Sequence, residues 1–176
     1  MFPSYTSASV ALLAMLGVAM AAPAQAEILK FQATLDGKYG QEPTGSAAIG
    51  RASIHVNTVT QRVSVDLGVD GITLDNLWDT LVKAPVGPVH FHKYATRNGG
   101  DAVLALPLPF GADYTATPSG LHVAMKDYDY VAGAALLKST LSFDDFVAGL
   151  RDGVIILNVH TDKYNPGEIS GVVVAD

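Results

Sequence analysis

Histidine is the residue type through which this sequence could do chemistry, and three of its five histidines are the strongest candidates. His90 and His92 are separated by one residue in a stretch that predicts a strand over 89–94. Because side chains alternate along a strand, both imidazoles point to one face, about 6.6–7 Å apart along the backbone. His160 ends another predicted strand, 154–160. Three neutral imidazoles with an open position suit zinc and copper equally, so we predict a metal site at His90, His92 and His160.

The same three histidines also have a purely structural interpretation. A His-x-His pair on an exposed face is either solvated or hydrogen-bonded to backbone carbonyl groups, where it fixes a loop. His55 and His122 each stand alone in an alternating stretch of sequence. For these two we expect a surface or partly buried position without a ligand.

Acidic residues offer weaker signals. Glu168 follows Pro166-Gly167 and opens the last predicted strand. Its carboxylate either accepts hydrogen bonds at that turn, or it orients His160 by a hydrogen bond to the ring nitrogen that does not bind the metal ion. Asp127-Tyr-Asp-Tyr130 is either a calcium or partner patch or, more simply, a polar strand face packed by tyrosines.

Nucleophilic catalysis finds no support in the sequence. No serine nucleophile elbow is visible, and the serines and histidines are not spaced like a catalytic triad. The chain contains no cysteine, which excludes a thiol nucleophile, a thiolate metal site and an iron–sulfur cluster. We therefore predict no catalytic residues, no cofactor-binding residues beyond the metal ligands, and no enzymatic activity.

The histidines must be positioned by short strands, because period-2 alternation dominates the chain after residue 26. In the clearest stretch, 62–69, four apolar residues face one way and the polar residues face the other. Such strands, separated by turn residues, predict an all-β fold, an antiparallel β-sandwich or barrel, with one or two short helices. The predicted strands cover 28–35, 46–56, 62–69, 89–94, 103–106, 121–125, 154–160 and 169–174, and the predicted helices cover 143–150 and 73–83.

The N-terminus predicts export. Residues 1–26 contain no Asp, Glu, Lys or Arg, Val10–Met20 is apolar or small throughout, and Ala24-Gln-Ala26 resembles a cleavage site. We expect a signal peptide over 1–26 and one domain over 27–176, periplasmic or secreted, with no membrane span after cleavage. The net charge of −6 argues against a nucleic-acid partner.

Several segments together resemble the chordin-type, or CHRD, domain, in a bacterial single-domain form. The most specific are Asn158-Val-His-Thr161 and Pro166-Gly-Glu-Ile-Ser-Gly171, in which Ser170 stands where the family usually has Arg. Phe31-Gln-Ala-Thr-Leu-Asp-Gly37, Gln41-Glu-Pro43 and Val89-His-Phe-His-Lys93 also resemble family motifs. The resemblance implies an extracellular β domain, similar in shape to immunoglobulin-like or superoxide-dismutase-like sandwiches. In animal chordin such domains belong to a secreted antagonist of growth factors, which implies protein binding.

Three hypotheses follow. The first is an exported, non-catalytic binding domain whose histidine cluster holds copper or zinc or is a hydrogen-bonded structural cluster. The second is a small copper or zinc metalloenzyme similar in shape to superoxide dismutase. The third is a purely structural cell-surface interaction module. The partners we expect are accordingly a metal ion or an extracellular protein.

Overall fold

The fold is one antiparallel sheet that curls over on itself. A computed structural model describes residues 27–40, 43–96 and 99–176, so the predicted signal peptide lies outside the described residues. The ten strands run in the order β5-β4-β8-β9-β1-β2-β3-β7-β6, and β10 pairs with β1. The strands are β1 (Ile28–Asp36), β2 (Ile49–Asn57), β3 (Arg62–Asp70), β4 (Val89–Thr96), β5 (Gly99–Leu108), β6 (Tyr114–Thr117), β7 (Gly120–Asp129), β8 (Ile155–Val159), β9 (Ile169–Val172) and β10 (Val174–Ala175), and the helices are η1 (Leu74–Asn76), α1 (Asp79–Val82), α2 (Tyr130–Leu136) and α3 (Phe143–Asp152).

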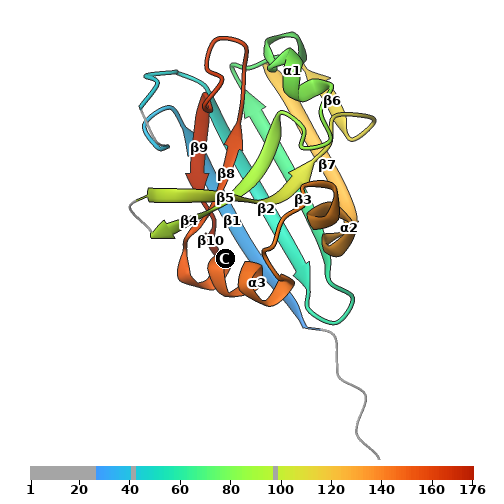
Figure 1. Ribbon diagram of the computed structural model, residues 1–176. Helices are drawn as coiled ribbons and strands as arrows, with labels where there is room; N and C mark the ends of the chain where they lie inside the picture. Colours follow the sequence, from blue (N-terminus) through green and yellow to red (C-terminus); the bar gives the residue numbers. More distant parts are fainter. Residues whose placement is uncertain (1–26, 41–42, 97–98) are drawn as a thin grey trace, which may run out of the picture.

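The core lies inside the curl of the sheet. In Figure 1, β4 and β5 cross in front of β1, β2 and β3, so one end of the sheet folds over its middle strands. Val63, Val65, Leu67 and Val69 point into this space, and each is at most 2% exposed. Alternation of this kind buries one face of each strand and leaves the other exposed to solvent. The all-β antiparallel fold predicted from the sequence is confirmed.

Helix α3 closes one end of the curl, the lower end in Figure 1. The Ser142 hydroxyl accepts a hydrogen bond from the Asp145 N–H (3.1 Å) and donates one to the Asp145 carboxylate (2.7 Å). This reciprocal cap satisfies a backbone donor that the helix itself leaves free. Gly153 ends the helix in the left-handed conformation, with φ 66°. The buried ring of Phe146 packs edge-on against Phe91 of β4, at 6.3 Å between ring centroids. The helix predicted over 143–150 is confirmed.

The segment 73–83 does not form the single helix that its apolar spacing predicts. It contains η1 and α1, which are separated at Leu77 (φ −60°, ψ 142°). Leu77 forms an antiparallel bridge with Thr161, and the Trp78 N–H donates to the His160 carbonyl (3.1 Å). Pairing with the chain that follows β8 therefore overrides the helical spacing.

The Asp127–Tyr130 segment is also only partly the strand face that the sequence predicts. Asp127 adopts a left-handed conformation (φ 47°), and β7 ends at Asp129. The Asp129 side chain accepts a hydrogen bond from the Ala132 N–H (3.0 Å) and so caps α2, and it pairs with Arg62 (3.2 Å). Tyr130 is buried and begins the helix. Helix α2 and β6 are absent from the sequence prediction.

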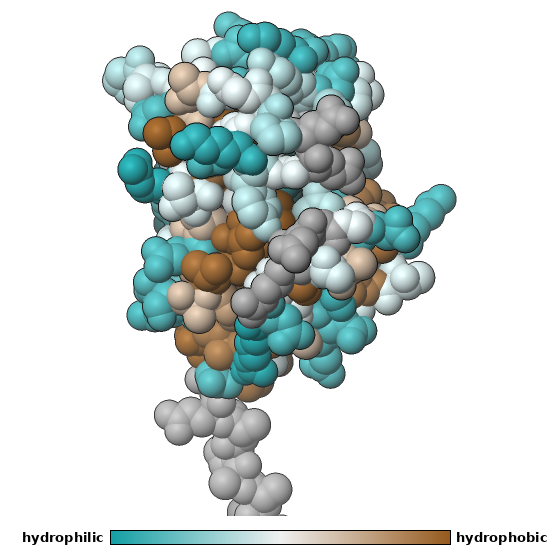
Figure 2. Space-filling model, turned by 90° about the vertical axis from the view of Figure 1, so that its left-hand side faces the viewer, coloured by the Kyte–Doolittle hydropathy of each residue, from teal (hydrophilic) through white to brown (hydrophobic). Residues whose placement is uncertain are grey.

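The outer face of the sheet is covered where β4 meets β8. All five residues of β8 are buried, although only alternate ones reach the core. The loop that contains Asn165 and Gly167 lies against this face, since the Asn165 carbonyl is 2.7 Å from His160 Nδ1 and a Cβ atom at Gly167 would lie 3.7 Å from Asn158 Nδ2. The Tyr164 hydroxyl joins this loop to the one around Thr44, because it donates to the Thr44 carbonyl (3.3 Å). Figure 2 shows the left side of the molecule, which is mainly hydrophilic in its upper half and carries an apolar patch lower down. Among the described residues, no helix is long and apolar enough to cross a membrane.

Candidate metal centre

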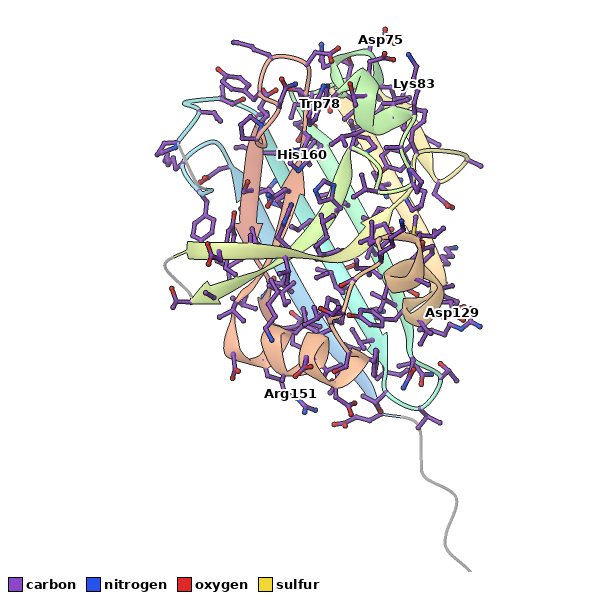
Figure 3. All side chains as sticks on the ribbon, in the orientation of Figure 1. Asp75, Trp78, Lys83, Asp129, Arg151 and His160 are labelled. Carbon is purple, nitrogen blue, oxygen red and sulfur yellow. The ribbon has the colours of Figure 1, made fainter. Side chains whose placement is uncertain are left out.

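Strand register brings the three predicted histidines together on the covered outer face. In the β4–β8 pair His90 lies opposite Asn158, and His92 lies opposite Ile156. His160 follows Asn158 by two positions and therefore continues along the same face. Its backbone N–H donates to the Pro88 carbonyl (2.8 Å), which extends the pairing beyond the end of β8. In Figure 3, His160 lies at the upper end of β8, close to Trp78.

The imidazole nitrogens of the three histidines converge. Each residue offers one ring nitrogen, and these atoms all lie within 4.8 Å of one another. The Nε2 atoms of His90 and His92 are 2.9 Å apart. The rings of His90 and His160 are stacked, with centroids 4.4 Å apart and an interplanar angle of 14°. The described residues thus contain the compact histidine cluster that the sequence predicts.

Hydrogen bonds to carbonyl groups define which ring nitrogens carry protons. His90 Nδ1 lies 2.9 Å from the Gly87 carbonyl, and His160 Nδ1 lies 2.7 Å from the Asn165 carbonyl. A carbonyl oxygen only accepts, so both Nδ1 atoms are donors. In the neutral ring the Nε2 atom then presents a lone pair. The His92 Nε2–H then donates to the His90 Nε2 lone pair, and a metal ion bound at His90 would replace this hydrogen bond. Within the described part of the chain, His160 Nε2 and His92 Nδ1 have no hydrogen-bond partner.

Burial keeps the cluster neutral. It lowers the pKa of His90 to about 3, and the neighbouring rings of His160 and His92 reinforce this effect against the Gly87 hydrogen bond. Burial and then the nearby His160 lower the pKa of His92 to about 4. Burial also lowers the pKa of His160, while the bond to Asn165 opposes it. At neutral pH all three imidazoles are uncharged, which is the form that binds metal ions.

Three buried polar atoms at this place have no partner. Among the described residues, the buried side-chain nitrogen and oxygen atoms without a hydrogen bond are His92 Nδ1, Asn158 Oδ1 and His160 Nε2. Asn158 lies on β8 opposite His90, and its side chain is hydrogen-bonded to Tyr94. Such orphaned atoms are rare in folded proteins and call for a missing partner. All three belong to one site.

A single ion bound by all three rings requires a small rearrangement. An imidazole binds a metal ion in its own plane, and the nearly parallel rings of His90 and His160 do not share such a point. A shared ion therefore requires one of these two rings to rotate about its side-chain torsions. The nitrogen atoms must also draw closer, because metal–nitrogen bonds of about 2.0–2.1 Å hold neighbouring ligand atoms roughly 3–3.5 Å apart, whereas the present set spans up to 4.8 Å.

Glu168 contacts the loops and not the imidazoles. Its two carboxylate oxygens accept hydrogen bonds from the hydroxyls of Ser46 and Thr161, both at 2.7 Å. The Thr44 hydroxyl donates to its backbone carbonyl, also at 2.7 Å. The polar group that orients His160 is instead the Asn165 carbonyl. Of the two roles considered for Glu168, the hydrogen-bonded turn is the one that the geometry supports.

The other two histidines lie away from the cluster. His122 Nε2 is 3.1 Å from the Asp66 carboxylate, on the outer face of the β3–β7 pair. His55 is exposed on β2. The sequence prediction also missed Asn158 and Tyr94, although both continue the alternation that carries the histidines along β8 and β4. That alternation, Asn158 with His160 and Tyr94 with His92, is the signal that could have identified them.

Comparison with known proteins identifies the family of this chain. The CHRD domain matches residues 31–173, nearly the whole chain, and the protein belongs to the CHRD family. The matched range includes all three histidines of the cluster. No curated protein and no solved structure matches the chain.

Proposed function

We propose that this protein is an exported, non-catalytic binding domain that holds one transition-metal ion, copper or zinc, at His90, His92 and His160. Under this proposal residues 1–26 are the signal peptide and 27–176 the CHRD domain. Membership of a family of binding domains supports the general class. The histidine cluster supports the metal.

The observation that carries the proposal is the set of unpaired buried atoms. Within the described residues, His92 Nδ1, Asn158 Oδ1 and His160 Nε2 have no hydrogen-bond partner, and they belong to the histidine cluster and to the residue opposite His90. Each unsatisfied buried polar group costs about 1–3 kcal/mol. A site that gathers three of them beside converging lone pairs is explained by a ligand that accepts electron pairs, as a metal ion does.

A structural role for the histidines has its own support and needs separate consideration. His90 and His160 do fix loops, since their Nδ1 atoms donate to Gly87 and Asn165. These bonds use one nitrogen of each ring only. The hydrogen bond between the Nε2 atoms of His92 and His90 accounts for one further contact. Neither explains why His160 Nε2 and His92 Nδ1 are buried without a partner among the described residues.

Metal uptake by purified variants tests the proposal. The protein is stripped with a chelator, equilibrated with Cu(II) or Zn(II), dialysed, and its metal content measured. We expect one ion per chain, lost in His90→Ala and in His160→Ala and retained in His55→Ala, the exposed control. Uptake that is unchanged in both cluster variants would refute the metal site. Dismutation of superoxide by the loaded protein beyond the free-ion rate would refute the non-catalytic assignment.

A further inference from the structure

The donor set of the cluster carries no negative charge. The three ligands are neutral imidazoles, and among the described residues no Asp or Glu joins their group. The Nδ1 atoms of His90 and His160 are hydrogen-bonded to backbone carbonyls, whereas the corresponding ring nitrogen in many zinc sites is bonded to a carboxylate. Glu168, eight residues after His160, has both oxygens occupied by Ser46 and Thr161. An ion bound here would keep its full charge.

The site is also buried deeply enough for that charge to matter. His90 is 3% exposed, Asn158 3% and His160 5%. Two neighbouring groups on this face are neutral as well: Tyr94 stacks near His92, at 6.4 Å between ring centroids, and Ser170 lies opposite Asn158. The carboxylate of Asp36 lies one strand further across the sheet, opposite Ser170. The desolvation penalty of an ion grows with the square of its charge, so a divalent ion is penalised about four times as much as a monovalent one.

The number of protein ligands also favours an ion of single charge. Zn(II) bound by three histidines completes a tetrahedron with water or hydroxide, which must enter the buried space. A monovalent d10 ion accepts two or three nitrogen ligands and needs no fourth group. Its single charge is also the one that a neutral, buried donor set tolerates best.

We propose that the site selects a monovalent soft ion, Cu(I), over Cu(II) and Zn(II). This inference rests on the proposed function, since it specifies the charge of the ion that the same three histidines bind. The protein would then be a Cu(I)-binding domain. Its specificity would come from the absence of a carboxylate at the position of Asn158, directly opposite His90.

Competition between ions tests this charge argument on the intact protein. Ag(I) is an air-stable probe for Cu(I), used in chloride-free buffer, and Cu(I) itself is measured under a reductant with a chromogenic chelator. We expect both monovalent ions to bind at least about a hundredfold more tightly than Zn(II), and excess Zn(II) not to displace Ag(I). Cu(I) should also bind more tightly than Cu(II). Equal or tighter binding of Zn(II) or Cu(II) would overturn the selectivity and leave the metal site intact, whereas binding of no ion would refute both.

Asn158→Asp provides a matched test, because it adds one negative charge with almost no change of shape. We expect the affinity for Zn(II) to rise about tenfold or more relative to that for Ag(I). Ser53→Asp, which adds the same charge on the exposed face of β2, should leave the ratio of the Zn(II) and Ag(I) affinities unchanged. If the folded Asn158→Asp protein keeps the wild-type ratio, charge does not determine the selectivity. If it fails to fold, the ion competition on the wild-type protein still decides.

Discussion

The Nε2 atoms of His90 and His92 lie 2.9 Å apart, although the two residues are separated by a full strand repeat. Their side chains lean together where the register of β4 against β5 shifts between Phe91 and His92. Irregularities of this kind bend a strand and redirect its side chains. On its other side β4 pairs regularly with β8, which holds the two histidines beside His160. The cluster therefore depends on one irregular and one regular strand pair.

Stability should fall as the pH is lowered through the range in which histidine ordinarily titrates. The pKa of His90 is lowered to about 3 and that of His92 to about 4, from an ordinary value of 6.5. Between pH 6.5 and 4 the unfolded chain therefore binds protons that the folded cluster does not. Each such histidine removes up to about 1.4 kcal/mol of unfolding free energy per pH unit on acidification. Urea unfolding from pH 7.5 to 4.5, with a chelator present, measures this slope.

Histidine variants distinguish the contribution of the cluster to this pH dependence from the contribution of carboxylates that titrate in the same range. His92→Gln should make the pH dependence shallower by the contribution of one histidine, whatever its effect at pH 7. His55→Gln, on the exposed face of β2, should reproduce the wild-type slope. A wild-type free energy of unfolding that stays constant from pH 6.5 to 5 would contradict a buried neutral cluster.

Gly87 should tolerate no side chain. Its φ is +75°, and a Cβ atom built there would lie 1.9 Å from the Leu108 carbonyl oxygen. Gly87→Ala therefore forces the backbone apart next to the carbonyl that orients His90, and we expect a loss of about 2–5 kcal/mol in unfolding free energy. Gly68→Ala is the control, since a Cβ atom there meets nothing within 4 Å. Thermal unfolding of Gly87→Ala within 1–2 °C of wild type would show that this turn is wrongly described.

Glu168 should matter for stability and not for metal binding. Glu168→Gln weakens the hydrogen bonds that Ser46 and Thr161 donate to the carboxylate, and we expect a loss of about 1–3 kcal/mol. The metal content after loading should equal that of the wild type. Glu27→Gln, which removes only an exposed contact to Arg151 at 4.0 Å, should change neither property. Loss of metal uptake in a folded Glu168→Gln protein would place this carboxylate in the metal site.

Cleavage after Ala26 is expected on export. Intact-mass analysis of the protein recovered from outside the cytoplasm should give a chain that begins at Glu27, because the Ala-Gln-Ala sequence supplies the small residues that signal peptidase requires. Ala26→Pro should block the processing and leave the precursor attached to the membrane. Recovery of the intact precursor from the cytoplasm would contradict the predicted signal peptide.

Local sequence patterns predict most of the fold, because buried apolar and exposed polar residues alternate strictly along the strands that form the core. Strand β3 and helix α3 follow from the spacing of their apolar residues, and Ser142 and Gly153 mark the helix ends. The 73–83 segment was mispredicted because its conformation depends on pairing with Thr161, more than eighty residues away. Helix α2 was missed because only the context after β7 turns Asp129 into a cap.

The histidines of the site were predictable, but their surroundings were not. The His-x-His spacing on one strand and a third histidine at the end of another identified the set. The register that places Asn158 opposite His90 is a property of the β4–β8 pairing, which sequence periodicity does not specify. The burial of an outer strand face is likewise determined by the loops around Thr44 and Tyr164, which are joined through long-range hydrogen bonds.

Nitrogen NMR distinguishes whether the ring nitrogens of His90, His92 and His160 bind one metal ion. Long-range 1H–15N correlation spectra of the five histidines are recorded before and after one equivalent of Ag(I) or Zn(II). We expect the Nε2 resonances of His90 and His160 and one ring nitrogen of His92 to shift together at a 1:1 ratio. The Nδ1 atoms of His90 and His160 should remain protonated, because both rings would bind the ion through Nε2. Shifts confined to His55 and His122, or no shift at all, would contradict the proposed site.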